Sequence, residues 1–249
     1  MKAMLLAAGR GERLRPLTDT TPKCMLPFEG KPLLEHWMSK LQSFGIREVV
    51  INIHHLAGVV VDHFGSGEGW NMRIEYSREL DLLGTSGALR QVKSQFEDER
   101  FLVIYADNQS TCRLDDIVNF HAQRGSVATM SACWIDDPRS CGIVGFDDQG
   151  RIERFLEKPT AEQVFSHYIN AGIYVFEPAV FDYIPSSGVS DFSRDVFPRM
   201  LAARAPLYAF AYDGYVLKFD TFEDWKKSEA VVADEKKLGS VKFASPLLS

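Results

Sequence analysis

The first 32 residues constrain the fold of this chain more than any other stretch. They read MKAMLLAAGRGERLRPLTDTTPKCMLPFEGKP, and the apolar run from Ala3 to Ala8 is typical of a buried parallel strand. The strand ends at Gly9-Arg10-Gly11-Glu12-Arg13, where the glycines permit a positive φ and let backbone N–H groups approach a ligand closely. The stretch therefore predicts a strand followed by a cationic loop that suits a polyphosphate.

Two familiar phosphate-binding motifs do not fit this stretch. The dinucleotide-binding fingerprint needs a third glycine that opens a helix and an acidic residue on the next strand, about 20 residues on. Here position 14 is Leu, and the next strand-like run begins near Glu48. The G-x-x-x-x-G-K-[ST] loop is also absent from the sequence. We therefore interpret Arg13, Arg15 and Lys23 as phosphate-binding cations of another kind of loop, which prolines stiffen.

Composition narrows the class of protein. The chain has 249 residues, of which 45% are hydrophobic, enough for one large globular domain. Its formal net charge of -6 disfavours a nucleic-acid partner. Because the sequence has no signal-like segment and no run of about 18 apolar residues, we expect no membrane partner and a cytoplasmic location. The cysteines lack C-x-x-C spacing and are expected to be buried thiols: Cys24, Cys112, Cys133 and Cys141.

Strand-like and helix-like patterns alternate along the chain. Helical spacing of apolar residues predicts helices at 33–44, 59–64, about 85–96, 114–123, 191–203 and 222–234. Strands are predicted at 3–8, 48–53, 72–76, 101–105, 127–135, 141–146, 152–157, 170–176, 207–212 and 215–219. The turn Asp147-Asp148-Gln149-Gly150 predicts a hairpin, an antiparallel excursion within the alternating pattern. We expect an α/β fold: a Rossmann-like mixed, mostly parallel sheet with helices on both faces, in a single domain.

The opening stretch resembles the sugar-1-phosphate nucleotidyltransferases, also called nucleotide-sugar pyrophosphorylases. That family usually begins GG-x-G-T-R-L-x-P-L-T and continues with P-K-x-x-x-P. This chain has AAGRGERLRPLT and PKCMLP, with Ala8 and Glu12 as departures. The resemblance extends from Lys2 to about Lys226 and is strongest to the mannose-1-phosphate and heptose-1-phosphate guanylyltransferase branch.

That resemblance implies the nucleotide-diphospho-sugar transferase fold, with a catalytic domain at 1–233. The hexapeptide repeats of a β-helix extension, which many relatives carry, are not found in the sequence. The tail at 234–249 contains Val241, Phe243, Leu247 and Leu248 and is a candidate interface segment for a homodimer.

The resemblance also implies a reaction between a nucleoside triphosphate and a sugar-1-phosphate, which gives a nucleotide sugar and pyrophosphate. The implied catalytic residues are Arg13, which steadies the triphosphate, Lys23, which bridges the two substrates, and Asp107, which holds Mg²⁺. The implied nucleotide-binding residues are Leu6, Ala7, Ala8, Gly9, Gly11, Arg13, Glu79, Asp81, Gly84 and Thr85. The implied sugar-phosphate-binding residues are Gly142, Glu157, Lys158 and Asn170.

The second metal-binding carboxylate is where the chain departs from the family. Relatives carry D-I-G-T-P-E-D after a strand, whereas this chain has K-F-D-T-F-E-D, which puts Lys218 at the position of the metal-binding Asp. Three interpretations stay open. Asp220, two residues on and on the same strand face, supplies the ligand. The Lys218 ammonium replaces the charge of the metal. Alternatively, the chain is catalytically impaired and acts as a regulatory protein that binds a nucleotide sugar.

Hydrogen-bonding chemistry bears on the choice of base. Relatives that use uridine or thymidine nucleotides tend to carry Gln where Glu79 stands. A carboxylate only accepts hydrogen bonds, and guanine offers two adjacent donors. Glu79 and Asp81 therefore favour GTP as the donor. The resemblance to the guanylyltransferase branch implies a mannose-like hexose- or heptose-1-phosphate as the acceptor and a GDP-sugar as the product. A uridylyl- or cytidylyltransferase acting on another phosphorylated acceptor is the alternative.

Overall fold

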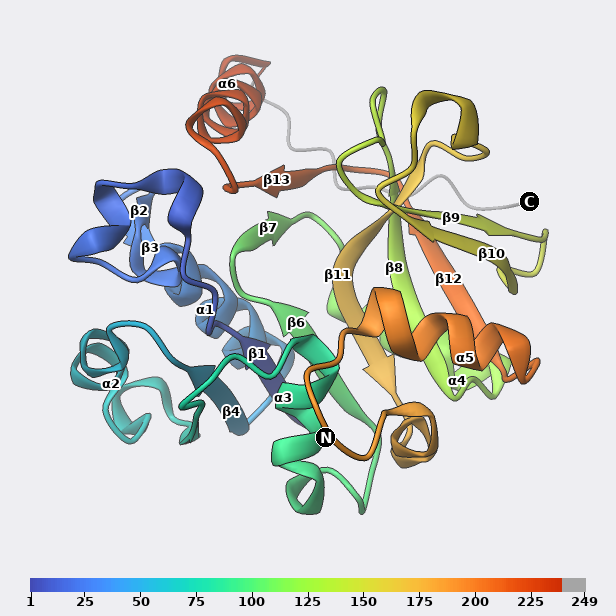
Figure 1. The fold of residues 1–249 in the computed structure, drawn as a ribbon. Helices are drawn as coiled ribbons and strands as arrows, with labels where there is room; N and C mark the ends of the chain where they lie inside the picture. The colour runs from blue at the N-terminus through green and yellow to red at the C-terminus, as the bar shows by residue number, and fades with distance from the viewer. Residues whose placement is uncertain (239–249) are drawn as a thin grey trace.

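The computed structural model describes residues 1–238, in which strands and helices alternate as predicted (Figure 1). The helices are α1 (Leu33–Phe44), α2 (Ala57–Phe64), α3 (Thr85–Gln91), α4 (Leu114–Arg124), α5 (Phe197–Ala202) and α6 (Phe222–Leu238). The main sheet contains β1 (Lys2–Leu6), β4 (Glu48–Ile53), β5 (Arg73–Arg78), β6 (Phe101–Tyr105), β8 (Ala128–Trp134), β9 (Gly142–Phe146), β10 (Ile152–Glu157), β11 (Tyr168–Phe176) and β12 (Leu207–Tyr212). Short strands form two ribbons, β2 (Pro27–Phe28) with β3 (Lys31–Pro32) and β7 (Asn108–Ser110) with β13 (Val216–Lys218).

The main sheet is mixed and mostly parallel, as predicted. Its strand order is β10-β9-β11-β6-β1-β4-β5, and β8 and β12 extend it from β11. Neighbours from β6 to β5 are parallel, whereas β11 is antiparallel to β6, β8 and β9, and β10 is antiparallel to β9. Only β10 and β11 therefore run against the other strands of this sheet. The β9–β10 hairpin turns where the Asp147 carboxylate accepts hydrogen bonds from the backbone N–H groups of Gln149 and Arg151.

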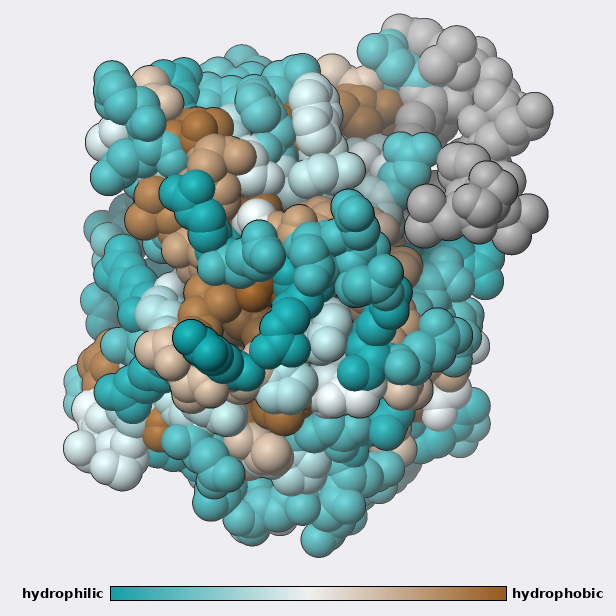
Figure 2. Space-filling view, turned by 90° about the vertical axis from the view of Figure 1, so that its right-hand side faces the viewer, coloured by the Kyte–Doolittle hydropathy of each residue, from teal (hydrophilic) through white to brown (hydrophobic). Residues whose placement is uncertain are grey.

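Helices cover both faces of the sheet, because its central strands are apolar on both sides. In β1, Ala3 and Leu5 pack on one side with residues of α1, α2 and α4, and Met4 and Leu6 pack on the other with residues of α3 and α5. Burial on both faces is typical of parallel strands. The outside of the molecule is different: on the face seen in Figure 2, hydrophilic side chains dominate and hydrophobic ones show mostly in the recesses between them.

The carboxyl ends of β1 and β6 place two parts of the chain side by side. The two strands pair in parallel, with Leu6 opposite Tyr105, so the glycine-rich loop and Asp107 leave the sheet at the same edge. The β7–β13 ribbon lies at this edge too, and it pairs Lys218 with Asn108 (Figure 1). Ligands of open α/β sheets collect at the carboxyl ends of the strands, so this edge is where a site is expected.

Two predicted helices differ from the structure. The helix predicted at 191–203 begins with a π-helical turn, Phe192–Val196, before α5. The backbone N–H of Val196 donates to the carbonyl of Asp191, which closes this wider turn, and the Asp195 carboxylate accepts from the backbone N–H of Asp191. In the other helix, α3 ends at Gln91, so Val92 and Phe96 are buried outside it. Apolar spacing alone does not reveal such irregular turns.

Other expectations need correction or fall outside the structure. Helix α6 runs to Leu238, so the expected domain boundary after residue 233 falls within a helix. Cys24, Cys112 and Cys133 are buried as predicted, but Cys141 is half-buried, because it stands at the edge of a cleft. Residues 239–249, with the proposed interface side chains, lie outside the described residues. Within residues 1–238, no helix combines the length and the apolar character needed to cross a membrane.

Trp37 offers a test of how α1 supports the edge of the sheet. Its side chain is fully buried, and its indole Nε1 donates a hydrogen bond of 2.7 Å to the backbone carbonyl of Asn108. We expect Trp37→Ala to lower the free energy of unfolding by about 3–5 kcal/mol, because it leaves a cavity. Trp37→Phe fills most of the space but leaves the carbonyl without a donor, at a cost of about 1–3 kcal/mol. Urea unfolding of both variants measures the two losses, and a Trp37→Phe variant as stable as the wild type would contradict this assignment of the hydrogen bond.

Candidate active site

Two clefts meet at the carboxyl edge of the sheet. The first, here called the loop cleft, has a volume of about 540 Å³ and is lined by Gly9, Arg10, Gly11, Glu12, Arg13, Lys23, Leu82, Asp107 and Asp220. The second, called the strand cleft, has a volume of about 280 Å³, and its walls include Asn108, Cys141, Gly142, Glu157, Lys158, Asn170 and Lys218. Arg13, Asp107 and Asp220 line both clefts. These three residues form a shared rim at which molecules held in the two clefts would meet.

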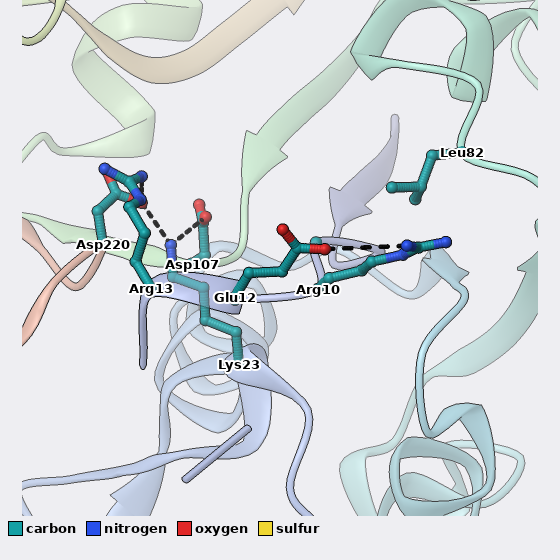
Figure 3. A pocket seen from close by; sticks show the side chains of 9 residues that line it. Arg10, Glu12, Arg13, Lys23, Leu82, Asp107 and Asp220 are labelled. Atoms are coloured by element: carbon teal, nitrogen blue, oxygen red, sulfur yellow. Dashed lines mark hydrogen bonds and ion pairs between the residues drawn. The ribbon is translucent and has the colours of Figure 1, made fainter. Parts of the chain in front are cut away.

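The ammonium of Lys23 lies between two carboxylates at this rim. Its Nζ is 2.6 Å from Oδ2 of Asp107 and 2.6 Å from Oδ1 of Asp220 (Figure 3). The Arg13 guanidinium reaches the same Asp220 oxygen at 3.4 Å. Only 6% of the Lys23 side chain is exposed, against 36% of Asp107 and 40% of Asp220. The structure places Arg13, Lys23 and Asp107 together, and Asp220, which one interpretation of the sequence made a metal ligand, lies with them.

Charge and burial act in opposite directions on these groups. Burial lowers the pKa of Lys23, but the charges and hydrogen bonds of Asp107 and Asp220 outweigh it, so the Lys23 pKa is raised overall. For Asp220, burial raises the pKa of the carboxyl, but Lys23, Arg13 and Lys218 together hold it below its usual value. Both groups are therefore charged at neutral pH.

The glycine-rich loop is held against the stem of Lys23. Gly11 has φ of 63°, and a Cβ there would lie 2.8 Å from Thr18 Cγ2 and 3.0 Å from Lys23 Cβ. The Thr18 hydroxyl donates a hydrogen bond of 2.9 Å to the Gly11 carbonyl. Since the backbone is both left-handed and in close contact, the position requires glycine. Gly11 and Lys23, twelve residues later, are therefore packed directly against each other.

Glu79, predicted to read the base, is instead part of a buried network. Only 3% of Glu79 is exposed; its Oε1 accepts a hydrogen bond of 2.6 Å from Asn52 Nδ2, and its Oε2 accepts one of 2.9 Å from the backbone N–H of Leu83. Asn52 Oδ1 in turn accepts from the backbone N–H of Ala7 at 2.6 Å. These hydrogen bonds hold the Glu79 side chain in the interior, so it does not line the loop cleft. Sequence reasoning missed Asn52, whose signal was an amide within an otherwise apolar strand.

Several other predicted nucleotide-binding residues also stand behind the cleft rather than in it. Leu6, Ala7 and Ala8 are buried at the end of β1. Gly84 packs against the backbone of Ser190, and the Thr85 backbone N–H donates to Asp191 Oδ1 at 3.0 Å. Of the predicted nucleotide-binding residues, Gly9, Gly11 and Arg13 line the loop cleft. Asp81 is exposed, and its neighbour in the chain, Leu82, also lines the loop cleft.

The predicted sugar-binding residues come together in the strand cleft. Gly142 on β9 pairs with Glu157 on β10, and a Cβ at Gly142 would lie 2.7 Å from Glu157 Oε2. Asn170 exchanges hydrogen bonds with the Tyr174 hydroxyl at 2.7 and 2.9 Å, which fixes its amide. Lys158 follows β10 with φ of 50°, a left-handed conformation that is rare for a lysine. Strain of this kind clusters at functional sites.

Asn108 is a further residue of this cleft, next to Asp107 in the chain. Its Nδ2 donates a hydrogen bond of 3.2 Å to the Ala171 carbonyl, while its Oδ1 is buried and has no hydrogen-bond partner within the described residues. A buried acceptor without a donor is costly, so this oxygen is a candidate to accept a hydrogen bond from a bound molecule.

The side chains of Lys218 and Asp220, at and just after the end of β13, contact different groups. Asp220 contacts Lys23 and Arg13, whereas Lys218 Nζ points to Ser140 Oγ at 2.8 Å and Cys141 Sγ at 3.3 Å. Of the three interpretations of this segment, the geometry matches the first, in which Asp220 joins Asp107. The resemblance puts Lys218 at the position of the family's aspartate, and Asp220, two residues on, lies on the same strand face.

The lowered pKa of Asp220 predicts how its ion pair responds to acid. A carboxyl whose pKa is lower in the folded state stabilises the fold above its unfolded pKa, and this stabilisation is lost as the pH falls through the folded value. We expect the unfolding free energy of the wild type to exceed that of Asp220→Asn by a constant amount above about pH 5, and the gap to close below about pH 4. Chemical unfolding between pH 2 and 7 tests this, with Asp148→Asn on the exposed β9–β10 turn as control. A gap that widens in acid would contradict it.

Comparison with known proteins agrees with this arrangement. The model of the nucleotidyl transferase family matches residues 2–226. The chain is 35% identical to a UTP–glucose-1-phosphate uridylyltransferase of Synechocystis over 95% of its own length, and 34% identical to a mannose-1-phosphate guanylyltransferase of Mycobacterium tuberculosis over 92%. It spans 65% and 63% of the lengths of these relatives.

A solved structure, a putative glucose-1-phosphate thymidylyltransferase of Bacillus anthracis in complex with a sucrose, superimposes with a TM-score of 0.84 at 25% identity and covers 98% of each chain. The expected nucleotide-diphospho-sugar transferase fold is thereby confirmed. Motif, sheet and family match agree along most of the chain, which belongs to the nucleotidyl transferase family.

Proposed function

We propose that the chain transfers a nucleotidyl group from a nucleoside triphosphate to a sugar-1-phosphate and releases pyrophosphate. The observation that carries the proposal is the pair of clefts with a shared rim of Arg13, Asp107 and Asp220. One cleft has the glycine-rich, cationic wall that suits a triphosphate, and the other has the carboxylate, amide and lysine groups that suit a phosphorylated sugar.

In this reaction, the main task of the protein is to position charged groups around the phosphates. An oxygen of the sugar phosphate forms a bond to the α-phosphorus, the bond from that phosphorus to the bridging oxygen of the β-phosphate breaks, and pyrophosphate takes the electron pair. No proton needs to move. Lys23, at the rim, is placed to neutralise the α-phosphate and the incoming phosphate, and Arg13 to bind the departing pyrophosphate with its forked guanidinium.

Mg²⁺ fits the carboxylates at the rim. Asp107 and Asp220 direct one oxygen each to the same point, where Lys23 Nζ lies in this structure. Mg²⁺ favours one or two carboxylates together with phosphate oxygens, and residues 1–238 contain no cluster of three or more His, Cys, Asp or Glu that would form a cage made of protein alone. Asp107 and Asp220 would hold the ion, which supplies neutralisation of phosphate charge when bound. Its arrival would release Lys23 toward the substrates.

The strand cleft supplies the acceptor contacts of this proposal. Glu157 accepts hydrogen bonds from sugar hydroxyls, Lys158 binds the phosphate, and Gly142 lets the ring approach the strand. Asn170 orients the ring, and the unpartnered Oδ1 of Asn108 accepts from a further hydroxyl. These groups fit a hexose- or heptose-1-phosphate.

GTP is the proposed donor. The mannose-1-phosphate guanylyltransferase of M. tuberculosis supports it, whereas the uridylyltransferase of Synechocystis supports UTP as the second candidate. Since Glu79 is engaged with Asn52 and Leu83, we assign the reading of guanine to Asp81, an exposed carboxylate beside Leu82 of the loop cleft. Its oxygens can accept from both donors on the edge of guanine.

A panel of triphosphates tests the base. With a hexose 1-phosphate and Mg²⁺, we expect kcat/KM for GTP to exceed that for UTP and dTTP at least about tenfold, as hydrogen bonds to charged groups allow. Asp81→Asn should lower the value for GTP about tenfold and change that for UTP much less. Pyrophosphate release measures both, and Asp148→Asn is the control. A wild-type preference for UTP would overturn the assignment of GTP.

The metal site is tested by removing one carboxylate at a time. Asp107→Asn and Asp220→Asn should each lower kcat about a hundredfold or more, because a catalytic metal stabilises the transition state by several kcal/mol. Each should also raise the Mg²⁺ concentration at half-maximal rate. Titration of pyrophosphate release with Mg²⁺ gives both quantities. If Asp220→Asn responds to Mg²⁺ like the wild type, position 220 is not a ligand.

A further inference from the structure

Lys218 is the cation of the strand cleft that the proposed reaction leaves without a role. Its half-buried ammonium donates to two neutral groups, the Ser140 hydroxyl at 2.8 Å and the Cys141 thiol at 3.3 Å. Among residues 1–234, whose side chains the structure describes, Lys218 forms no ion pair with a carboxylate within 4.0 Å. Its positive charge is therefore only weakly compensated.

Two carboxylates beyond ion-pair distance of Lys218 interact with its charge, and each is paired with another cation that lies closer to it. Lys218 contributes to lowering the pKa of Asp220 and of Asp137. Asp220 is 2.6 Å from Lys23 Nζ, and Asp137 is 2.7 Å from Arg139. Neither neutralises Lys218 directly.

The position of the ammonium along the cleft indicates what it faces. Phosphate transfer would occur at the shared rim of Arg13, Asp107 and Asp220. Ser140 and Cys141, which hold the ammonium, line the strand cleft but not the loop cleft. Cys141 directly precedes Gly142, which pairs with Glu157 at the end assigned to the sugar ring. Lys218 thus lies in the strand cleft and outside the loop cleft, which is assigned to the triphosphate.

We propose that Lys218 selects an acceptor whose sugar carries a second anionic group, a carboxylate or a second phosphate, in addition to its anomeric phosphate. The inference rests on the proposed function and narrows its acceptor. A neutral sugar would cover the ammonium and leave its charge without a counter-ion, which costs free energy. An anionic substituent would gain a charge-assisted hydrogen bond from a group that Ser140 and Cys141 already hold in place.

The test compares three acceptors with the preferred triphosphate and Mg²⁺: a hexose 1-phosphate, a hexuronate 1-phosphate and a hexose 1,6-bisphosphate. We expect the wild type to favour at least one anionic acceptor about 10- to 100-fold in kcat/KM. Lys218→Met should reduce this ratio of anionic to neutral acceptor by the same factor, mainly through KM, and Lys218→Arg should keep it. The hexuronate and bisphosphate arms show which anion is bound. Lys93→Met, at an exposed lysine paired with Glu97, should leave the ratio unchanged.

Three results would overturn the inference or its basis. Equal use of neutral and anionic acceptors by the wild type contradicts it, as does an equal loss for all acceptors in Lys218→Met, which would assign Lys218 to the anomeric phosphate. Absence of pyrophosphate release with every triphosphate and acceptor contradicts the proposed function itself. In that case, calorimetric Kd values of the hexose and hexuronate 1-phosphates for the wild type and Lys218→Met still decide the role of Lys218.

Discussion

The contact of one buried ammonium with two carboxylates holds the candidate site together. Lys23 comes from the loop after β1, Asp107 from the end of β6 and Asp220 from the segment after β13, and the ammonium is 2.6 Å from each acid. Burying a lysine is unfavourable unless its charge is compensated, and removing one partner of such a group is more costly than the pair is worth. The contact therefore fixes the relative positions of three segments that are far apart in the sequence.

The same contact limits what the site can do before substrates bind. In this structure Lys23 and Arg13, which line the loop cleft, are paired with carboxylates of the same rim. A triphosphate or a divalent cation changes this balance, because each brings a charge that competes with the existing pairs. The carboxylates that pair with Lys23 and Arg13 could thus be replaced by phosphate groups of a substrate. The two clefts meet at the rim, where this replacement would take place. A more strongly buried and fully paired cluster would be stable but unable to release its lysine.

Much of the fold followed from the sequence, because its signals are local. Five predicted elements have the expected bounds: Leu33–Phe44, Glu48–Ile53, Phe101–Tyr105, Ile152–Glu157 and Leu207–Tyr212. Most of them are clear periodic or apolar runs. Arg13, Lys23 and Asp107 were found through motifs. Glu79 and Asn52 were not understood, since their network joins β1, β4 and the loop after β5 through contacts that no local pattern encodes. For the same reason, the strand predicted at 215–219 was found as β13, but its pairing with β7 was not predicted.

The segment after Tyr215 shows how a short strand can serve two functions at once. Leu217 and Phe219 are buried in a small cluster with Phe28 and Leu33, so the alternate residues Lys218 and Asp220 must face the clefts. Asp220 then reaches the rim, where the proposed reaction takes place, and Lys218 reaches the strand cleft. Because both depend on one register, an insertion of a single residue would turn both inward and expose the apolar pair. The proposed chemistry and the proposed choice of acceptor therefore both depend on the burial of two hydrophobic side chains, Leu217 and Phe219.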